Sequence, residues 1–380
     1  MITPSSSESI DRIFNAHKIK FEKMNMLFGS VDIKDVISRV NIFINIESII
    51  HCIHTPTVEE FILSMDKTET KNFHFSIISN ILNLAGHYRR FFTKNRIKTN
   101  IVLFMNEYDK YTTLNNTMFL KHYRERFIYD YTDNPNFEAV NMILESVIKA
   151  LRTIVGYVEG VYLVTSNRLE SSLIPLLLCD SKSLDGQLNI MITRDEYDLQ
   201  YVNKNFLIMY PKGDESYIVT RENLFNIIRE KHEIKNSYKL PAYLIPFILA
   251  IVGDKRRGIG KIKGCGWKTI YKGLYKLFDK LDISDAEVVG LEHLIMAIKD
   301  SPSGENDNKE KVTKNIMCVD IDRQLGMVSE TQKLSVTKQL VDKFENDALK
   351  NLNSKYFEQY PINVVELNQY SVRSTKKALF

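Results

Sequence analysis

Short apolar runs rich in β-branched residues recur along the first half of the chain, and longer segments of helical periodicity separate them. Such runs predict strands that are buried on both faces of a sheet. The five predicted strands are 40–46, 100–105, 158–165, 188–193 and 206–210. The main helical segments are 73–92, 117–155 and 169–179. Their alternation predicts an α/β domain with a mostly parallel sheet flanked by helices, whose carboxyl edge gathers the chemically active side chains.

The pattern changes after residue 238, where helices and glycines replace the strands. Apolar helices are predicted at 240–252 and 270–281, on either side of a glycine-rich basic segment. Residues 301–311 are polar and predict a solvated linker, followed by a mostly helical tail. We expect an N-terminal extension (1–39), an α/β domain (40–238), a helical subdomain (239–300) and a linker with a helical C-terminal extension (301–380).

Composition sets the broad class. The chain has 380 residues, of which 44% are hydrophobic and 26% charged, which is typical of soluble globular proteins and too long for one ordinary core. The start of the chain has no signal-peptide pattern, and the longest apolar run is too short to span a bilayer. Cys52, Cys179, Cys265 and Cys318 form no CxxC pair, so reduced thiols and a cytoplasmic location without membrane contact are expected.

The net charge of +4 conceals two basic stretches that contain no acid. In the first, between residues 71 and 106, basic residues crowd beside aromatic ones; they are Arg89, Arg90, Lys94 and Arg96. The second, 255–278, interleaves lysines and arginines with glycines at the start of a predicted helix. A charged stretch is often only a solvated surface, and for the first stretch that alternative stays open.

The second stretch predicts a phosphate-backbone site. Glycines let backbone N–H groups approach an anion closely, and a helix N-terminus adds a favourable dipole. Contacts of this kind read the backbone and not the bases, so binding should be salt-sensitive and largely independent of sequence. The candidate binding residues are Lys255, Arg256, Arg257, Lys261, Lys263, Gly264, Gly266, Lys268 and Thr269.

Two segments resemble signatures of the flap endonuclease and phage 5′-nuclease family. Residues 250–270 resemble a Gly-Asp-x-x-Asp-Asn-Ile-Pro-Gly stretch that runs into Gly-Ile-Gly-x-Lys-Thr-Ala. Residues 192–200 resemble a strand-end motif, Ser/Thr-x-Asp-x-Asp-(two residues)-Gln-Leu. The resemblance covers roughly residues 40–280. It implies a PIN-like sheet domain followed by a helix–three-turn–helix subdomain that grips duplex DNA.

In this family, carboxylates at the strand ends hold two or more Mg²⁺ ions that activate water and stabilise the leaving oxygen. The chain departs from that pattern at most positions. Asn45 and Asn106 stand where the resemblance expects the first two acids, and Tyr197 and Arg257 replace two later ones. The family's acidic helix matches 169–172, which keeps one acid, Glu170.

Three interpretations remain open. The chain is a nuclease-fold protein without catalysis or a metal cofactor, which the cation at Arg257 favours because a cation repels a metal and attracts phosphate. Alternatively, it is a divergent Mg²⁺-dependent 5′-3′ exonuclease or flap endonuclease. Its rearranged metal site would contain Glu47, Glu107, Glu170, Asp195, Asp198 and Asp254, of which the last four would be catalytic. Thirdly, it is a protein-interaction scaffold without DNA binding.

We favour the first interpretation: a protein that binds the backbone of double-stranded or branched DNA. Its composition, together with the loss of family acids, suggests a bacteriophage protein that serves other proteins of a viral replication, repair or transcription complex. A second DNA contact is expected from the first basic stretch or from the arch-like region that contains Lys121, Arg124 and Arg126. Those three could equally be the solvated surface of an amphipathic helix.

Overall fold

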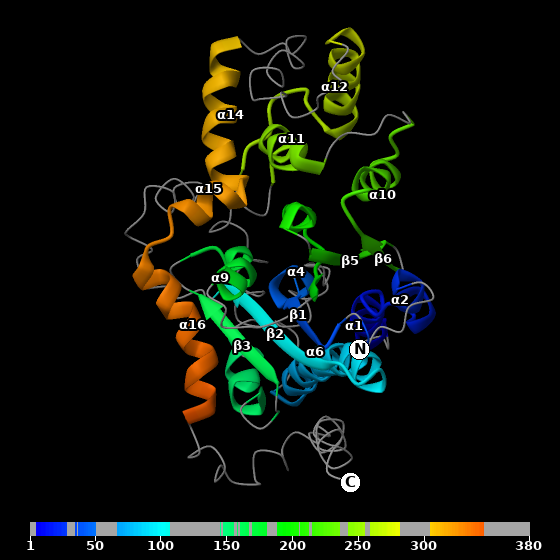
Figure 1. Cartoon of the computed structure of the whole chain (residues 1–380), viewed down its shortest axis with the longest axis vertical. Coiled ribbons are helices and arrows are strands. Elements are labelled where there is room, and N and C mark those ends of the chain that lie inside the picture. Colours follow the sequence, from blue (N-terminus) through cyan, green and yellow to red (C-terminus); the bar gives the residue numbers. More distant parts are fainter. Residues whose placement is uncertain are drawn as a thin grey trace.

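A six-stranded sheet forms the centre of the molecule in the computed structural model (Figure 1). The structure describes residues 5–28, 35, 37–50, 67–106, 145, 147–155, 158, 160–166, 169–180, 188–204, 206–212, 215–235, 242–254, 259–281 and 305–345. The strands are β1 (Arg39–Asn45), β2 (Lys98–Asn106), β3 (Val161–Ser166), β4 (Leu188–Ile192), β5 (Phe206–Lys212) and β6 (Glu215–Val219). The predicted α/β class and all five predicted strands are confirmed.

The strand order is β3-β2-β1-β4-β5-β6, and β1 to β5 run parallel. β6 pairs antiparallel with β5 and is not predicted by the sequence, because its five residues mix polar and apolar side chains. The order reverses between β1 and β4, since the chain winds to β2 and β3 on one side and to β5 on the other. Crevices in such sheets open at this reversal, outside the carboxyl ends of the strands.

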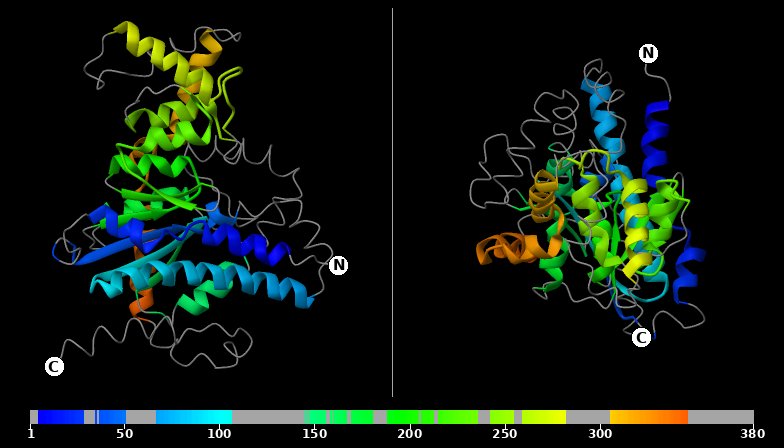
Figure 2. Two further views of the ribbon diagram at one scale, coloured as in Figure 1. Left: turned by 90° about the vertical axis from the view of Figure 1, so that its right-hand side faces the viewer. Right: turned by 90° about the horizontal axis from the view of Figure 1, so that it is seen from above.

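Helices cover both faces of the sheet. They are α1 (Ser5–Asn15), α2 (Phe21–Phe28), α4 (Ile46–Ile50), α6 (Lys67–Lys94), η1 (Ser171–Leu173), α9 (Ile174–Asp180), η2 (Tyr197–Lys204), α10 (Leu224–Lys231), η3 (Ala242–Leu244), α11 (Ile245–Val252), α12 (Trp267–Leu281), α14 (Glu305–Val319), α15 (Ile321–Gly326) and α16 (Glu330–Glu345). Figure 2 shows α1 and α6 on one side of the sheet, whereas α11 and α12 lie beyond its other side. None of the helices described is long and apolar enough to cross a membrane.

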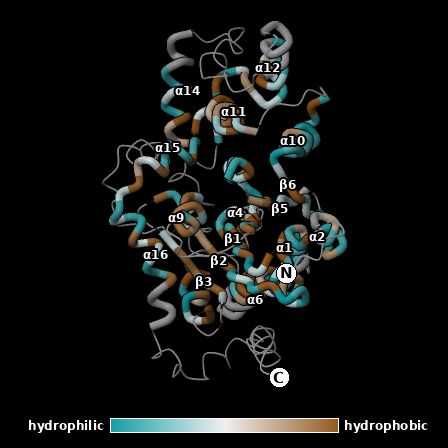
Figure 3. Tube along the Cα trace, viewed as in Figure 1, coloured by the Kyte–Doolittle hydropathy of each residue, from teal (hydrophilic) through white to brown (hydrophobic). Residues whose placement is uncertain are grey.

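Alternation along the strands divides the interior into two cores. In β1, Ile42 and Ile44 face α6, and Phe43 faces the opposite core, as the period of two requires. The opposite core continues from the sheet through α9, η2, α11, α12, α14 and α16. One buried core therefore extends across residue 238, where the sequence changes pattern. Figure 3 shows the apolar stretches concentrated in the central strands and α11.

Three asparagines form a ladder across the middle strands at their amino ends. Asn41 of β1 stands in register with Asn100 of β2 and with Asn189 of β4. The Asn100 amide donates to Asn41 Oδ1 at 3.0 Å, and the Asn41 amide donates to Asn189 Oδ1 at 3.0 Å. Asn41 is fully buried, so a register shift of either neighbour would leave a buried amide unsatisfied.

The C-terminal extension is part of the same body. The predicted linker at 301–311 is wrong from residue 305 onward, because α14 begins at Glu305. Its first turns are polar, and its anchoring comes later: Asn315 is fully buried and donates to the carbonyls of Ala250 and Gly260. A polar helix start resembles a linker in sequence, since the apolar contacts that fix it are a turn or two further on.

The extensions contact both edge strands of the sheet. At the β3 edge, the Gln339 amide of α16 accepts a hydrogen bond from Thr165 N at 2.9 Å and donates to Thr165 O at 2.7 Å. It thereby imitates the backbone of a neighbouring strand. At the β6 edge, Lys23 of α2 pairs with Glu215 at 2.8 Å and lies over the Tyr217 ring. At Thr165 the backbone N–H and C=O are occupied by Gln339 and cannot pair with a strand of another chain.

The N-terminal extension packs through a buried histidine, His17, which is 0% exposed. Its Nδ1 donates to the Ile13 carbonyl at 2.7 Å, and its own carbonyl accepts from the Tyr88 hydroxyl at 2.6 Å. Burial lowers the pKa of His17 from 6.5 to about 4, although the bond to Ile13 opposes the shift; the nearby Arg194 adds to it.

The free energy of unfolding should fall as the pH drops from 6.5 toward 4. In this window the unfolded chain binds a proton at His17 that the folded chain refuses, because the pKa of His17 is about 4 in the folded state. The loss attributable to His17 approaches about 3 kcal/mol. Urea unfolding at about pH 7 and about pH 4.5 should show a smaller pH-dependent loss for His17→Gln than for the wild type. Equal losses would contradict this account.

Candidate strand-end site and nucleic-acid interface

Polar side chains gather where β1, β2 and β4 end, at the reversal of strand order. Asn45 is the last residue of β1, Asn106 the last of β2, and Thr193 follows β4 directly. All lie on the face of the sheet opposite α6, because each is an even number of positions from an inward-facing core residue such as Phe43 or Met191. These side chains therefore lie at the carboxyl edge of the sheet, where the sequence predicts the site.

The centre of this site is Asp198, whose carboxylate is 0% exposed. Asn45 Nδ2 donates to Asp198 Oδ2 at 2.8 Å, and the Thr193 hydroxyl donates to the same oxygen at 2.6 Å. The orientation of the Asn45 amide is fixed, since its Oδ1 accepts from Ser48 N at 2.9 Å. An amide nitrogen and a hydroxyl therefore satisfy Asp198 Oδ2. The amide belongs to Asn45, the residue at which the family resemblance expects an acid.

A second cluster joins the ends of β1 and β2. Glu47 Oε2 accepts a hydrogen bond from Asn106 N at 3.2 Å and lies 3.5 Å from the Ser171 hydroxyl. Asn106 Oδ1 accepts from Ser171 N at 2.8 Å. The three residues tie the first turn of α4, the end of β2 and the start of η1 together. The side-chain oxygen of Asn106 is therefore held by a backbone N–H group at the start of η1.

Asp195 and Glu170 are buried at the same edge, 4% and 7% exposed. Asp195 has a structural role, because its Oδ1 accepts a hydrogen bond from Tyr197 N at 3.0 Å at the start of η2. The Asp195 backbone N–H in turn donates to the Thr193 hydroxyl. Glu170 immediately precedes η1, and its carbonyl accepts from Leu173 N.

The described side chains do not fit a pair of Mg²⁺ ions. Mg²⁺ needs several oxygen ligands with free lone pairs, whereas Asp198 Oδ2 already accepts from two donors. Within the described ranges, no three carboxylate, histidine or cysteine side chains are grouped to share a metal ion. Asp254 forms a backbone bridge with Ile259, and Glu107 falls outside the described residues. The proposed six-acid metal site is therefore not assembled by the part of the chain that the structure describes.

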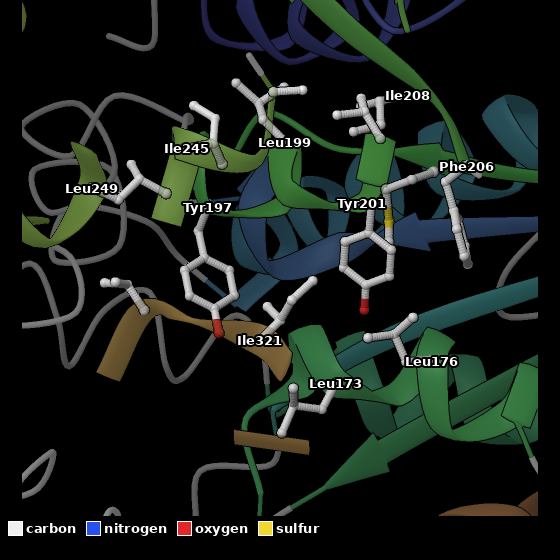
Figure 4. Close-up of a cluster of buried hydrophobic side chains, with 14 of the residues drawn as sticks. Leu173, Leu176, Tyr197, Leu199, Tyr201, Phe206, Ile208, Ile245, Leu249 and Ile321 are labelled. Carbon is white, nitrogen blue, oxygen red and sulfur yellow. The ribbon is translucent and has the colours of Figure 1, made fainter. Parts of the chain in front are cut away.

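Tyr197 does not occupy the place of the family's second acid. Its side chain points away from the sheet edge toward α15 (Figure 4), where its hydroxyl donates to Gln324 Oε1 at 2.9 Å. The next residue, Asp198, takes the position beside Asn45 instead. The motif pairs the second acid with Tyr197, but the residue beside the strand end is the next one, Asp198. The segment after β4 is a 3₁₀ helix, and its turn brings Asp198 back to the strand end.

A further polar cluster, which the sequence does not indicate, connects the segment after β4 to the start of α12. Glu196 Oε1 accepts from His232 Nε2 at 2.8 Å and from Lys231 at 2.8 Å. Burial raises the pKa of Glu196, but the bonds from His232 and Lys231 outweigh it and hold the pKa below its usual range. The His232 ring stacks on Trp267, with centroids 4.8 Å apart and an interplanar angle of 19°.

The glycine-rich segment begins with a tight return of the backbone. Gly253 has a φ of 71°, and a Cβ there would lie 2.5 Å from the Ile259 carbonyl oxygen, so only glycine fits. Asp254 N and Ile259 N exchange hydrogen bonds with each other's carbonyls. The chain then turns through Gly264, with a φ of 77°, into α12. A Cβ on Gly266, just before α12, would meet nothing within 4 Å, so this residue leaves open space beside the helix start.

Lysines form one exposed face along α12 and the loop before it. Lys268, Lys272 and Lys276 recur every four residues, and the buried residues Ile270 and Leu274 occupy the other side of the helix. We call these three lysines, together with the exposed loop residues Lys261 and Lys263, the lysine face. Gly264, Gly266 and Thr269 are exposed beside it. Lys255, Arg256 and Arg257 are outside the described residues.

The first basic stretch does not extend this face. Arg89 is buried, 4% exposed, so its prediction as a nucleic-acid contact is wrong; Tyr88, Phe91 and Phe92 beside it belong to the core. Arg90 is half-buried, and Lys94 and Arg96 are exposed near the start of β2. The nine residues of β2 separate that end from the site by roughly 26 Å. Lys121, Arg124 and Arg126 are outside the described residues, so the arch-like contact stays a prediction.

No protein-family model and no curated protein matches the sequence. Among solved structures, the bacteriophage T5 D15 flap endonuclease, in a pseudo-enzyme–product complex with DNA and metal ions, is similar at 14% identity with a TM-score of 0.45, over 81% of this chain and 100% of that one. Bacteriophage T5 5′-exonuclease with bound zinc is similar at 14% identity and a TM-score of 0.45, over 80% and 99%. These are likenesses of fold alone.

Asn45→Asp should destabilise the protein at neutral pH. It would place a second carboxylate at the 2.8 Å contact with Asp198, where two charges cannot both be tolerated without a proton or a cation. We expect a loss of about 2–4 kcal/mol at pH 7, shrinking as the pH falls and one carboxyl takes up a proton. Thermal unfolding of wild type, Asn45→Asp and the uncharged control Asn45→Ser would measure it. Equal melting temperatures for Asn45→Asp and wild type would contradict the assigned bond.

Proposed function

We propose that this protein binds the sugar–phosphate backbone of double-stranded or branched DNA and does not cleave it. The observation that carries the proposal is the lysine face: five exposed lysines on α12 and the preceding loop. They lie next to exposed backbone at Gly264 and Gly266, and open space surrounds Gly266. A helix N-terminus with accompanying lysines favours phosphate oxygens, because unpaired N–H groups and positive charge point the same way. No base-reading group is required for such binding.

The strand-end site supports a non-catalytic role. Phosphodiester cleavage by this fold class needs metal ions held by clustered carboxylates. In this chain the two strand-end asparagines are engaged with protein groups, Asn45 with Asp198 and Asn106 with Ser171. Asp198 Oδ2 and both asparagine side chains are therefore engaged within the protein, which supports a structural role for them.

The proposed setting is a viral replication, repair or transcription complex in the host cytoplasm, in which the protein is a subunit or accessory factor. Cys179, Cys265 and Cys318 are free thiols, which suits a reducing compartment. The two extensions enlarge the molecule beyond the pattern of the resembled family and leave polar surfaces on α14 and α16 for contacts with other proteins.

Replacing three loop and helix lysines should weaken duplex binding and flatten its salt dependence. In Lys261→Ala/Lys263→Ala/Lys268→Ala, the slope of log affinity against log salt should fall by up to about 3, since each phosphate contact releases about 0.9 counterion. Fluorescence anisotropy with a labelled duplex at several salt concentrations measures both quantities.

The matched control removes three exposed lysines outside both basic stretches: Lys20 just before α2, Lys149, and Lys338 on α16. It changes the net charge equally, so any general effect of charge appears in both variants. Binding is expected to stay within about twofold of wild type in the control. Equal losses in the two triple variants would count against the lysine face as the contact.

A 5′-flap duplex incubated with the protein and Mg²⁺ or Mn²⁺ should be recovered intact, because the described acids are not arranged to hold the ions. Denaturing electrophoresis of end-labelled substrate at a protein excess is the measurement. Cleavage that persists through purification and disappears in Asp195→Asn would establish the divergent enzyme instead. Retained folding of that variant, checked by its melting temperature, would be needed because Asp195 caps η2.

A further inference from the structure

A chain of three side chains connects the strand-end segment to the first residue of α12. Glu196 lies between the two acids of the strand-end motif, and His232 follows α10. Trp267 begins α12, directly before Lys268 of the lysine face. These three residues come from three separate segments of the sequence, and they meet outside the hydrogen-bond network of Asp198.

His232 contacts both partners at once. Its Nε2 donates to Glu196 Oε1 at 2.8 Å, and its ring stacks on Trp267 with centroids 4.8 Å apart. The charged groups around it are Glu196 and Lys231, with Lys268 and Glu233 paired at 3.5 Å on the solvent side. The side chain of His232 is 24% exposed and that of Glu196 is 21% exposed, so the contact is shielded but not sealed.

At its start, α12 is held by Trp267, which packs partly against the buried core and stacks on His232. Its buried residues, Ile270, Tyr271 and Leu274, fix the helix against the core from its second turn onward. At the first turn, Trp267 is half-buried, and Lys268 and Thr269 are exposed. A tilt of that turn would move the leading lysine and the open backbone at Gly266 together.

We propose that His232 is a positioning residue that fixes the first turn of α12 against the strand-end segment. A nucleic-acid backbone held by the lysine face is thereby directed along the carboxyl edge of the sheet. This rests on the proposed function, because α12 is taken as the bound surface. His232 is assigned a positioning role because its Nε2 is committed to Glu196 and one face of its ring stacks on Trp267.

Trp267 is the single tryptophan of the chain, so its fluorescence reports this contact without any nucleic acid. In His232→Ala, the emission should shift to longer wavelength and acrylamide quenching should rise about twofold, because the indole loses the ring that covers it. His232→Phe keeps the stack and should keep most of the shielding. Unchanged emission and quenching in His232→Ala would overturn the assigned contact.

Duplex binding separates positioning from direct contact. His232→Ala should lower affinity about fivefold, with the salt slope unchanged, because no lysine is removed. The single variant Glu196→Gln keeps an acceptor for His232 and should bind with nearly wild-type affinity. Glu196→Ala removes the acceptor and should lose affinity as His232→Ala does. A reduced salt slope in His232→Ala would instead make His232 a phosphate contact and overturn the proposal.

The two proposals fail in different ways. A wild-type chain that binds no duplex at low salt overturns the proposed function. A wild-type chain that binds, with His232→Ala binding equally well, overturns the positioning role alone. His232→Phe guards against misfolding as a cause, since it preserves the packing of the site; circular dichroism and the melting temperature of each variant complete the comparison.

Discussion

A carboxylate buried without solvent must have donors, and Asp198 obtains them from Asn45 and Thr193. Isolated charges in a protein interior are far more costly than the whole free energy of folding allows, so this pairing constrains everything around it. It holds the end of β1 beside the segment after β4, where the strand order reverses. An acid at residue 45 would demand a cation at the same point. The Asn45 amide and the Thr193 hydroxyl together supply donors to Asp198 Oδ2.

In the proposed function, the surface that would bind a phosphate backbone is separate from the strand-end acids. The lysine face and the glycine turns before α12 need only exposed charge and free backbone, and they persist without any metal. The strand-end acids lie in the interior and serve as acceptors for N–H and O–H groups, as Asp195 does for Tyr197 N and Glu47 for Asn106 N.

The pattern of apolar residues was sufficient to predict the parallel strands of the sheet, because strands buried on both faces are continuous apolar runs. It also located the polar residues at which those strands end. It could not identify Asp198 as the partner of Asn45, because a 3₁₀ turn shifts the register by one residue. Charge counting failed at Arg89, since an acid-free stretch gives no sign of which side of α6 is buried. The contact between His232 and Trp267 joins residues far apart in the chain, and neither residue signals it alone.

The asparagine ladder has a consequence for how the chain folds. Its two hydrogen bonds span 59 and 148 residues, so neither forms until β1 has met β2 and, separately, β4. Closing such long loops costs entropy before any contact compensates for it, and a half-assembled sheet leaves buried amides unsatisfied. Intermediates with only two of the three strands in place are therefore penalised. The ladder makes assembly of the central sheet a concerted, late and comparatively slow event.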